Sequence, residues 1–207
     1  NMNVYHACVS TGSEPCEQAF DTYTASNGIS LDLLGAGNAG VTNAQNAIDG
    51  NANTASSISI GAAGVAASVY QYVDFHTLSA VTDHFRVKLK MDGGSVISAE
   101  VLGSIVVKAF NGDEEVFSQR LRDGLVSDLD LLDLLQGGEV LSLPFGPGRA
   151  FDRVAIGIES LLSANVINNP LQVFSIERFS AACPDPELQD PPVTTPPFNQ
   201  KDCGTTV

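Results

Sequence analysis

Apolar and polar residues alternate with a period of two along much of the chain, a pattern typical of β-strands with one face in a core. The clearest case is 84–91, where Phe85, Val87, Leu89 and Met91 alternate with histidine or basic residues. We expect these four side chains to face the core and the intervening ones to face water. Weaker strands are predicted at Ser68–Phe75, Ile105–Phe110, Glu115–Leu121, Val140–Phe145, Phe151–Glu159 and Leu171–Phe179.

Turn residues separate these segments. Asn111-Gly112-Asp113 predicts a hairpin, because Asn and Gly accept the positive φ that tight turns require. The segment Leu125–Gln136 places leucines in nearly every helical direction, so it is either a short helix or a strand followed by a helical turn, and we favour the helix. Many short strands without alternating long helices predict an all-β protein, an antiparallel β-sandwich with at most one or two short helices.

The end of the chain differs in composition from the rest. Prolines concentrate after Cys183, and they favour extended polyproline-like chain over a packed sheet. We therefore expect residues 1–183 to form the β-sandwich module and residues 184–207 to form a Pro-rich linker that leads toward a following module.

Charge and hydropathy exclude several kinds of partner. The chain has 24 acidic against 10 basic residues, a formal net charge of −14, so it lacks the clustered cations that nucleic acid or an anionic membrane surface requires. No apolar run approaches the roughly 18 residues of a membrane helix, so we expect no membrane insertion.

Four cysteines lie near the two ends of the chain, at Cys8, Cys16, Cys183 and Cys203. Their spacing does not match the close pairs of zinc sites, so disulfides are the better interpretation, although the residues alone leave three pairings open. Disulfides favour an oxidising, extracellular location. The chain contains no N-x-S/T glycosylation motif, which favours a bacterial origin.

Motifs of catalysis and nucleotide binding are weak. Gly35-Ala36-Gly37-Asn38-Ala39-Gly40 spells G-x-G-x-x-G, but no helix and second parallel strand follow, so we interpret it as a small-residue loop. There is no G-x-S-x-G motif, and His6, His76 and His84 have no partner at metal-ligand spacing. We do not expect an enzyme.

The segment 46–54 carries the most informative chemistry. It reads Asn-Ala-Ile-Asp-Gly-Asn-Ala-Asn-Thr and clusters hard oxygen donors, which suit calcium, around a glycine that permits a tight turn. A plain Asx-rich turn explains the composition equally well.

This segment resembles the A-x-D-G-x-x-x-T signature of discoidin or coagulation-factor type C domains, which are galactose-binding-like jelly rolls. Phe151–Ile156 resembles the late core strand of that family, and Ile176–Phe179 resembles its closing strand. The stretches Leu131–Gly138 and Ala150–Val154 are also similar to modules of large secreted surface proteins of Bacteroidota. That likeness implies type IX secretion and roles in adhesion or gliding motility.

The resemblance also implies a structural calcium ion. Its ligands would be the carbonyls of Asn46 and Asn51, the side chains of Asp49 and Thr54, and Glu177 from the closing strand. The family's terminal disulfide would join Cys16 to Cys183, which leaves Cys8 to pair with Cys203. In place of the tryptophan that usually follows the threonine, this chain has Ala55-Ser56-Ser57.

Two functions are compatible with these features. The first is a non-enzymatic adhesion or stalk module of a multidomain bacterial cell-surface protein, stabilised by calcium and disulfides, with the neighbouring modules as its partners. The alternative is a carbohydrate-binding module that recognises surface glycans through Tyr70, Tyr72 and Phe110. We rank the stalk first because the chain has no Trp, the usual platform for sugar stacking.

Overall fold

The structure, a computed structural model, describes residues 17–19, 21–27, 40–60, 68–91, 99–123, 137–159 and 170–180. Strands dominate these residues, together with one short α-helix and two 3₁₀ turns. In chain order the elements are β1 (Glu17–Gln18), β2 (Asp21–Asn27), β3 (Gly40–Thr42), η1 (Ala44–Ala47), β4 (Ser56–Ser59), β5 (Ser68–Asp74), β6 (His84–Met91), α1 (Ala99–Ser104), β7 (Ile105–Asn111), β8 (Glu114–Arg120), η2 (Leu121–Asp123), β9 (Leu141–Phe145), β10 (Arg153–Glu159) and β11 (Leu171–Phe179).

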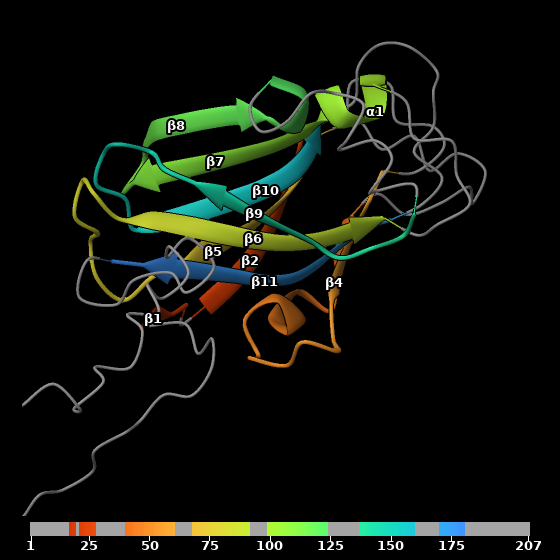
Figure 1. The fold of residues 1–207 in the computed structure, drawn as a ribbon, viewed down its shortest axis with the longest axis horizontal. Coiled ribbons are helices and arrows are strands. Elements are labelled where there is room, and N and C mark those ends of the chain that lie inside the picture. The colour runs from red at the N-terminus through yellow and green to blue at the C-terminus, as the bar shows by residue number, and fades with distance from the viewer. Residues whose placement is uncertain are drawn as a thin grey trace, which may run out of the picture.

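The strands form two antiparallel sheets that pack face to face (Figure 1). One sheet has six strands, in the order β3-β4-β11-β6-β9 with β1 paired to β11, and the other has five, in the order β2-β5-β10-β7-β8. The predicted antiparallel β-sandwich is therefore confirmed. None of the helices in the described part of the chain is long and apolar enough to cross a bilayer.

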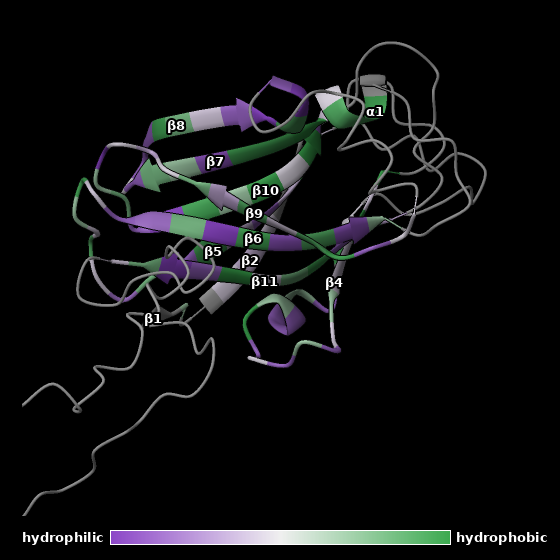
Figure 2. Cartoon of the chain, in the orientation of Figure 1, coloured by the Kyte–Doolittle hydropathy of each residue, from purple (hydrophilic) through white to green (hydrophobic). Residues whose placement is uncertain are grey.

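The core lies between the two sheets and is filled by the inward-facing residues of both. At one end of it Phe85 contacts three other phenylalanines, with ring centroids 5.3 Å from Phe145, 5.5 Å from Phe151 and 6.3 Å from Phe117. Figure 2 shows the alternation of hydrophilic and hydrophobic positions along β6, the strand whose pattern is clearest in the sequence. Phe85, Val87, Leu89 and Met91 are all buried, as predicted.

The other face of β6 does not simply meet water, as the alternation predicts. Arg86 is only 2% exposed, and its guanidinium carbon lies 5.7 Å from the ring centroid of Phe179. His84 stacks on the same ring at 5.5 Å. The prediction of a solvated outer face was wrong at Arg86, because its guanidinium lies over the ring of Phe179 on the neighbouring strand β11.

The predicted hairpin at Asn111-Gly112-Asp113 is confirmed. It joins β7 to β8, and Gly112 has a φ of +57°. The four cysteines, the segment Leu125–Gln136, most of the G-x-G-x-x-G stretch and the Pro-rich residues 184–207 lie outside the described residues.

A buried polar cluster links the two sheets around Gln71 of β5, which is fully buried. Ser56 Oγ on β4 donates to Gln71 Oε1 at 2.6 Å, and Gln71 Nε2 donates to the carbonyl of Ala44 at 2.9 Å and to Thr22 Oγ1 at 3.2 Å. Thr22 Oγ1 in turn donates to the carbonyl of Tyr72 at 2.9 Å. Because these groups satisfy one another, the cluster ties β2, β4 and β5 together without the cost of unpaired buried polar atoms.

Candidate functional site

The outer face of the five-stranded sheet carries a second hydrophobic cluster, separate from the core. It contains Tyr70 and Tyr72 of β5, Val106 and Phe110 of β7, and Ala155 of β10. The period of two explains this face, because Val69, Gln71 and Val73 of β5 point into the sandwich while the tyrosines between them point outward. The sheet thus brings Tyr70, Tyr72 and Phe110, the three candidate ligand residues from the sequence, onto one surface.

One end of this face is open to solvent, and we call its three rings, Tyr23, Tyr72 and Phe110, the aromatic patch. Tyr23 and Tyr72 are cross-strand partners whose rings are parallel within 4°, with centroids 4.8 Å apart. The ring of Phe110 lies 5.8 Å from that of Tyr72, across the intervening strand β10, where Ala155 is opposite Tyr72 and Arg153 is opposite Phe110. Tyr23 is 38% exposed, and the other two rings are half-buried.

A charged pair borders the aromatic patch. Arg153 Nε donates to Asp74 Oδ1 at 2.6 Å, and Arg153 Nη1 donates to the carbonyl of Gly112 at 3.3 Å. The guanidinium carbon of Arg153 lies 5.5 Å from the ring centroid of Tyr23. The hydrogen bond to Asp74 raises the pKa of Arg153 above its ordinary value. The edge of the patch therefore offers both acceptor and donor groups.

The other end of the outer face is closed. Tyr70 is only 5% exposed, because its ring lies over Gly157 of β10 and Lys108 Nζ covers it at 4.9 Å from the ring centroid. A Cβ at Gly157 would lie 2.3 Å from Tyr70 Cδ1, so this position of the ring requires glycine there. The tyrosine hydroxyl donates to Glu159 Oε1.

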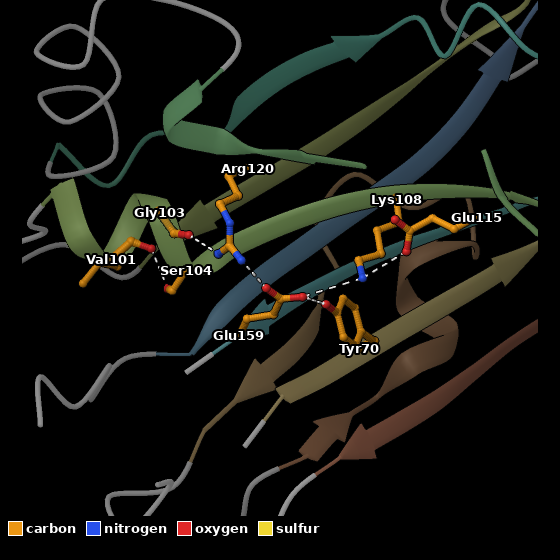
Figure 3. Close-up of polar contacts among 8 residues, drawn as sticks. All are labelled: Tyr70, Val101, Gly103, Ser104, Lys108, Glu115, Arg120 and Glu159. Carbon is orange, nitrogen blue, oxygen red and sulfur yellow. Dashed lines mark hydrogen bonds and ion pairs between the residues drawn. The ribbon is translucent and has the colours of Figure 1, made fainter. Parts of the chain in front are cut away.

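Figure 3 shows the polar contacts around Glu159. Arg120 pairs with Glu159 Oε2 and also donates to the carbonyl of Gly103 at 2.5 Å. Lys108 Nζ lies 3.6 Å from Glu159 Oε1 and 3.2 Å from Glu115 Oε2. Tyr70, Lys108 and Arg120 thus all contact the carboxylate of Glu159.

These contacts shift two pKa values in opposite directions. Burial, and then the hydrogen bond to Glu159, raise the pKa of the Tyr70 hydroxyl from 10.0 to about 12. Burial of Glu159 acts to raise its pKa, but the hydrogen bond from Tyr70 and the charges of Arg120 and Lys108 outweigh it and lower the pKa. Glu159 is therefore held as a carboxylate and Tyr70 as a neutral donor at neutral pH.

The calcium candidates of segment 46–54 form one compact turn. The Asn51 N–H donates to Asp49 Oδ1 at 2.8 Å, and Thr54 Oγ1 lies 2.7 Å from Asp49 Oδ2 and 3.0 Å from the carbonyl oxygen of Asn51. Asn46 lies in η1, where its side chain donates to the carbonyl of Ala55 at 3.1 Å. The turn brings the carboxylate, the hydroxyl and one carbonyl into mutual contact, a donor set that suits a hard cation.

Glu177, the remaining candidate, lies on β11. Its Oε1 is 3.9 Å from Lys88 Nζ. Because β4 runs antiparallel to β11, the chain before Ser56 runs toward the half of β11 that carries Glu177. No group of three or more His, Cys, Asp or Glu residues in the described part of the chain is arranged to hold a metal ion, and the candidate set contains only two of that kind.

Sequence reasoning missed Tyr23, Arg153 and Asp74. The strand β2 contributes Tyr23, which lies between two threonines, so three consecutive residues favour a β-strand. This propensity could have predicted the strand, although it shows no hydrophobic alternation. The contact of Tyr72 with both Tyr23 and Phe110 could not be predicted, since it depends on the order of the strands in the sheet.

The sequence matches no known family profile, and no curated protein matches it. Among solved structures, the chain is similar to a Streptococcus pneumoniae fucose binding module, with 16% identity, coverage of 80% of this chain and 95% of that chain, and a TM-score of 0.39. It is also similar to the GH31 CBM32-2 module bound to GalNAc, with 11% identity, coverage of 78% and 99%, and a TM-score of 0.38.

Proposed function

We propose that this chain is a carbohydrate-binding module that binds a glycan on the aromatic patch. The observation that carries the proposal is the clustering of Tyr23, Tyr72 and Phe110, partly exposed, beside the Asp74–Arg153 pair. A sugar ring presents an apolar C–H face and a rim of hydroxyls, so its site needs aromatic surface together with a few oriented polar groups. The three rings and the Asp74–Arg153 pair all lie on β-strands, whose backbone hydrogen bonds hold them in fixed positions.

The pKa of Glu159 argues against this residue as the general acid of a glycoside hydrolase. Glycoside hydrolysis uses two carboxyl groups, one of which must keep a proton near neutral pH through a raised pKa. Glu159 on this face has a lowered pKa, and its partners are the hydroxyl of Tyr70 and two cations. It is therefore poorly suited to act as a general acid.

The sequence alone favours a stalk module over a carbohydrate-binding module, and the proposal reverses this ranking. The ranking rests on the lack of Trp in the chain, but tyrosine and phenylalanine rings provide apolar surface of the same kind. A stalk has no need of such a partly exposed cluster on one sheet face. An extracellular location, where polysaccharides are encountered, remains part of the proposal.

A glycan array probed with the whole chain, followed by calorimetry on the glycans it retains, tests the function. We expect Tyr23→Ala and Tyr72→Ala each to weaken binding by about tenfold or more, a loss of about 1.4 kcal/mol or more. Val81→Ser is the matched control, because Val81 is an exposed apolar residue in the loop after β5 and lies outside the patch. A chain that retains no glycan, or patch variants that bind as the wild type does, would overturn the proposal.

We also propose that the turn at 46–54 binds a structural calcium ion. Asp49, Thr54 and the Asn51 carbonyl would hold it together with the Asn46 carbonyl and Glu177, and the ion would offset part of the carboxylate repulsion in a chain of net charge −14. Chelation should lower the melting temperature, and excess calcium should restore it where magnesium does not. An unchanged melting curve in chelator, with no metal found by elemental analysis, would exclude the ion.

A further inference from the structure

We infer that the glycan bound at the aromatic patch is electrically neutral, and that sulfated, sialylated or uronate-containing chains are rejected. This inference rests on the proposed function and names the class of ligand. It follows from the arrangement of charge on the outer face of the five-stranded sheet. There each cation near the rings is already paired with a carboxylate of the same face.

Arg153 is the cation nearest the exposed rings. Its Nε is held by Asp74 at 2.6 Å and its Nη1 by the Gly112 carbonyl at 3.3 Å, while the guanidinium lies over Tyr23. An anionic sugar that approached Arg153 would bring its negative charge beside the Asp74 carboxylate, which is hydrogen-bonded to the same guanidinium. The repulsion between these two negative charges is unfavourable.

The other two cations are held in the same way. Lys108 lies within 3.2 Å of Glu115 and 3.6 Å of Glu159, and it covers the ring of Tyr70 (Figure 3). Arg120 pairs with the second oxygen of Glu159. Both cations are half-buried and already paired, so they are poorly placed to turn toward a new anion.

The ion-paired charges on this face balance. The cations Arg153, Lys108 and Arg120 pair with the carboxylates Asp74, Glu115 and Glu159, three of each sign. Asp113 adds a further negative charge that acts on Tyr23. The face adds no local attraction to offset a net charge of −14 on the whole chain, so an acidic polymer is repelled as it approaches.

A neutral sugar meets neither difficulty. Its hydroxyls both donate and accept, so adjacent hydroxyls can donate to Asp74 and accept from Arg153 while the ion pair stays intact. Its C–H face can pack on the rings without bringing a charge near the carboxylates. The pair therefore orients the ligand and selects against acidic chains at the same time.

A paired array tests the inference, with each neutral glycan printed beside its sulfated, sialylated or uronate counterpart. Calorimetry would then compare polygalacturonate and heparosan with their carboxyl-reduced forms. We expect the neutral member of a bound pair to bind at least about tenfold more tightly. The difference should shrink as salt is raised, because screening weakens charge repulsion.

Charge variants sharpen the test. Asp74→Asn removes the carboxylate that holds Arg153, so the preference for the neutral member should fall by about threefold or more. Asp123→Asn makes the same change of net charge at an exposed pair with Arg122, on η2 beyond the far end of β8, and should leave the preference unchanged. A preference that moves equally in both variants would show that net charge alone sets it and would overturn the role of Asp74.

The possible failures are distinguishable. If the acidic member of a pair binds as tightly as the neutral one, and the binding is lost in Tyr23→Ala, the inference is overturned while the proposed function stands. If no member of any pair binds, the proposed function fails and the inference fails with it.

Discussion

Tyr70 and Tyr72 stand two residues apart on the same face of the same strand, yet they have opposite roles. Tyr72 is a half-buried member of the aromatic patch, stacked against an exposed ring. Tyr70 is covered by Lys108 and donates its hydroxyl to Glu159. Both residues are tyrosines on the same strand, so residue type does not account for the difference.

The neighbouring strand accounts for it. Tyr70 is opposite Gly157 of β10, and Tyr72 is opposite Ala155. Because Gly157 has no Cβ, the ring of Tyr70 packs directly against the backbone of β10. In this position its hydroxyl donates a hydrogen bond to Glu159. The availability of an aromatic residue for a ligand is thus decided by the size of the residue across from it.

Gly157→Ala should produce the largest effect. The new methyl would lie 2.3 Å from Tyr70 Cδ1 and 2.5 Å from the backbone carbonyl oxygen of Val69, and the carbonyl cannot simply rotate away. We expect a loss of about 1–3 kcal/mol in the free energy of unfolding, measured by urea denaturation. Gly146→Ala is the control, because no atom lies within 4 Å of its added Cβ, and it should change stability by less than about 0.5 kcal/mol. Equal effects at the two glycines would contradict our explanation of the closed end.

Tyr70→Phe should have a smaller effect on stability. It should also show that the closed end of the outer face does not take part in glycan binding. It removes the hydroxyl that donates to Glu159, so we expect a loss of about 1 kcal/mol in stability. Glycan affinity should stay within about twofold of the wild type, since the patch does not use this hydroxyl. A loss of affinity as large as that of Tyr72→Ala would show that the closed end takes part in binding.

The lowered pKa of Glu159 predicts a loss of stability in acid. A carboxylate whose pKa is lower in the folded state stabilises the fold above its unfolded pKa, near 4.5, and that contribution disappears as the pH falls through the lower folded value. Glu159→Gln should therefore flatten the dependence of stability on pH below about 4.5, as measured by denaturation at a series of pH values. Retention of the full wild-type slope in this variant would count against the prediction.

The raised pKa of Tyr70 predicts the smallest effect, at alkaline pH. Its contribution to stability is present below pH 10.0 and is lost as the pH rises through its folded pKa of about 12. An ultraviolet titration of tyrosinate should show one tyrosine that ionises near pH 12, and Tyr70→Phe should remove that late phase. If the late phase persists in the variant, it belongs to another tyrosine.

Much of the fold can be predicted from the sequence. The strands β5 to β11 were all expected within about two residues of their ends, because alternation and turn residues act locally. Strands β1 to β4 were not expected, since short strands of mostly polar or small residues carry little periodic hydrophobic signal. The β-sandwich class depends on the number of strands more than on any one of them, so it was predicted despite these omissions.

Less of the candidate site can be predicted. Tyr70, Tyr72 and Phe110 were chosen as the available aromatics, and their common face follows from alternation once the strands pair. The exposure of each ring could not be derived, because it depends on Gly157, Ala155 and Lys108 across the sheet. Contacts between strands distant in the sequence carry no local signature.

The buried Gln71 fixes the register of β5 and therefore which of its residues lie on the outer face of the sheet. Valines and tyrosines are both apolar enough to fill a core, so hydrophobicity alone would tolerate β5 slipped by one residue, with Tyr70 and Tyr72 inside. In that register Gln71 would lose its hydrogen bonds to the buried Ser56 hydroxyl and to the Ala44 carbonyl. The fully buried Gln71 therefore fixes the register of β5, and through the register it determines which residues of the strand lie on the outer face of the sheet.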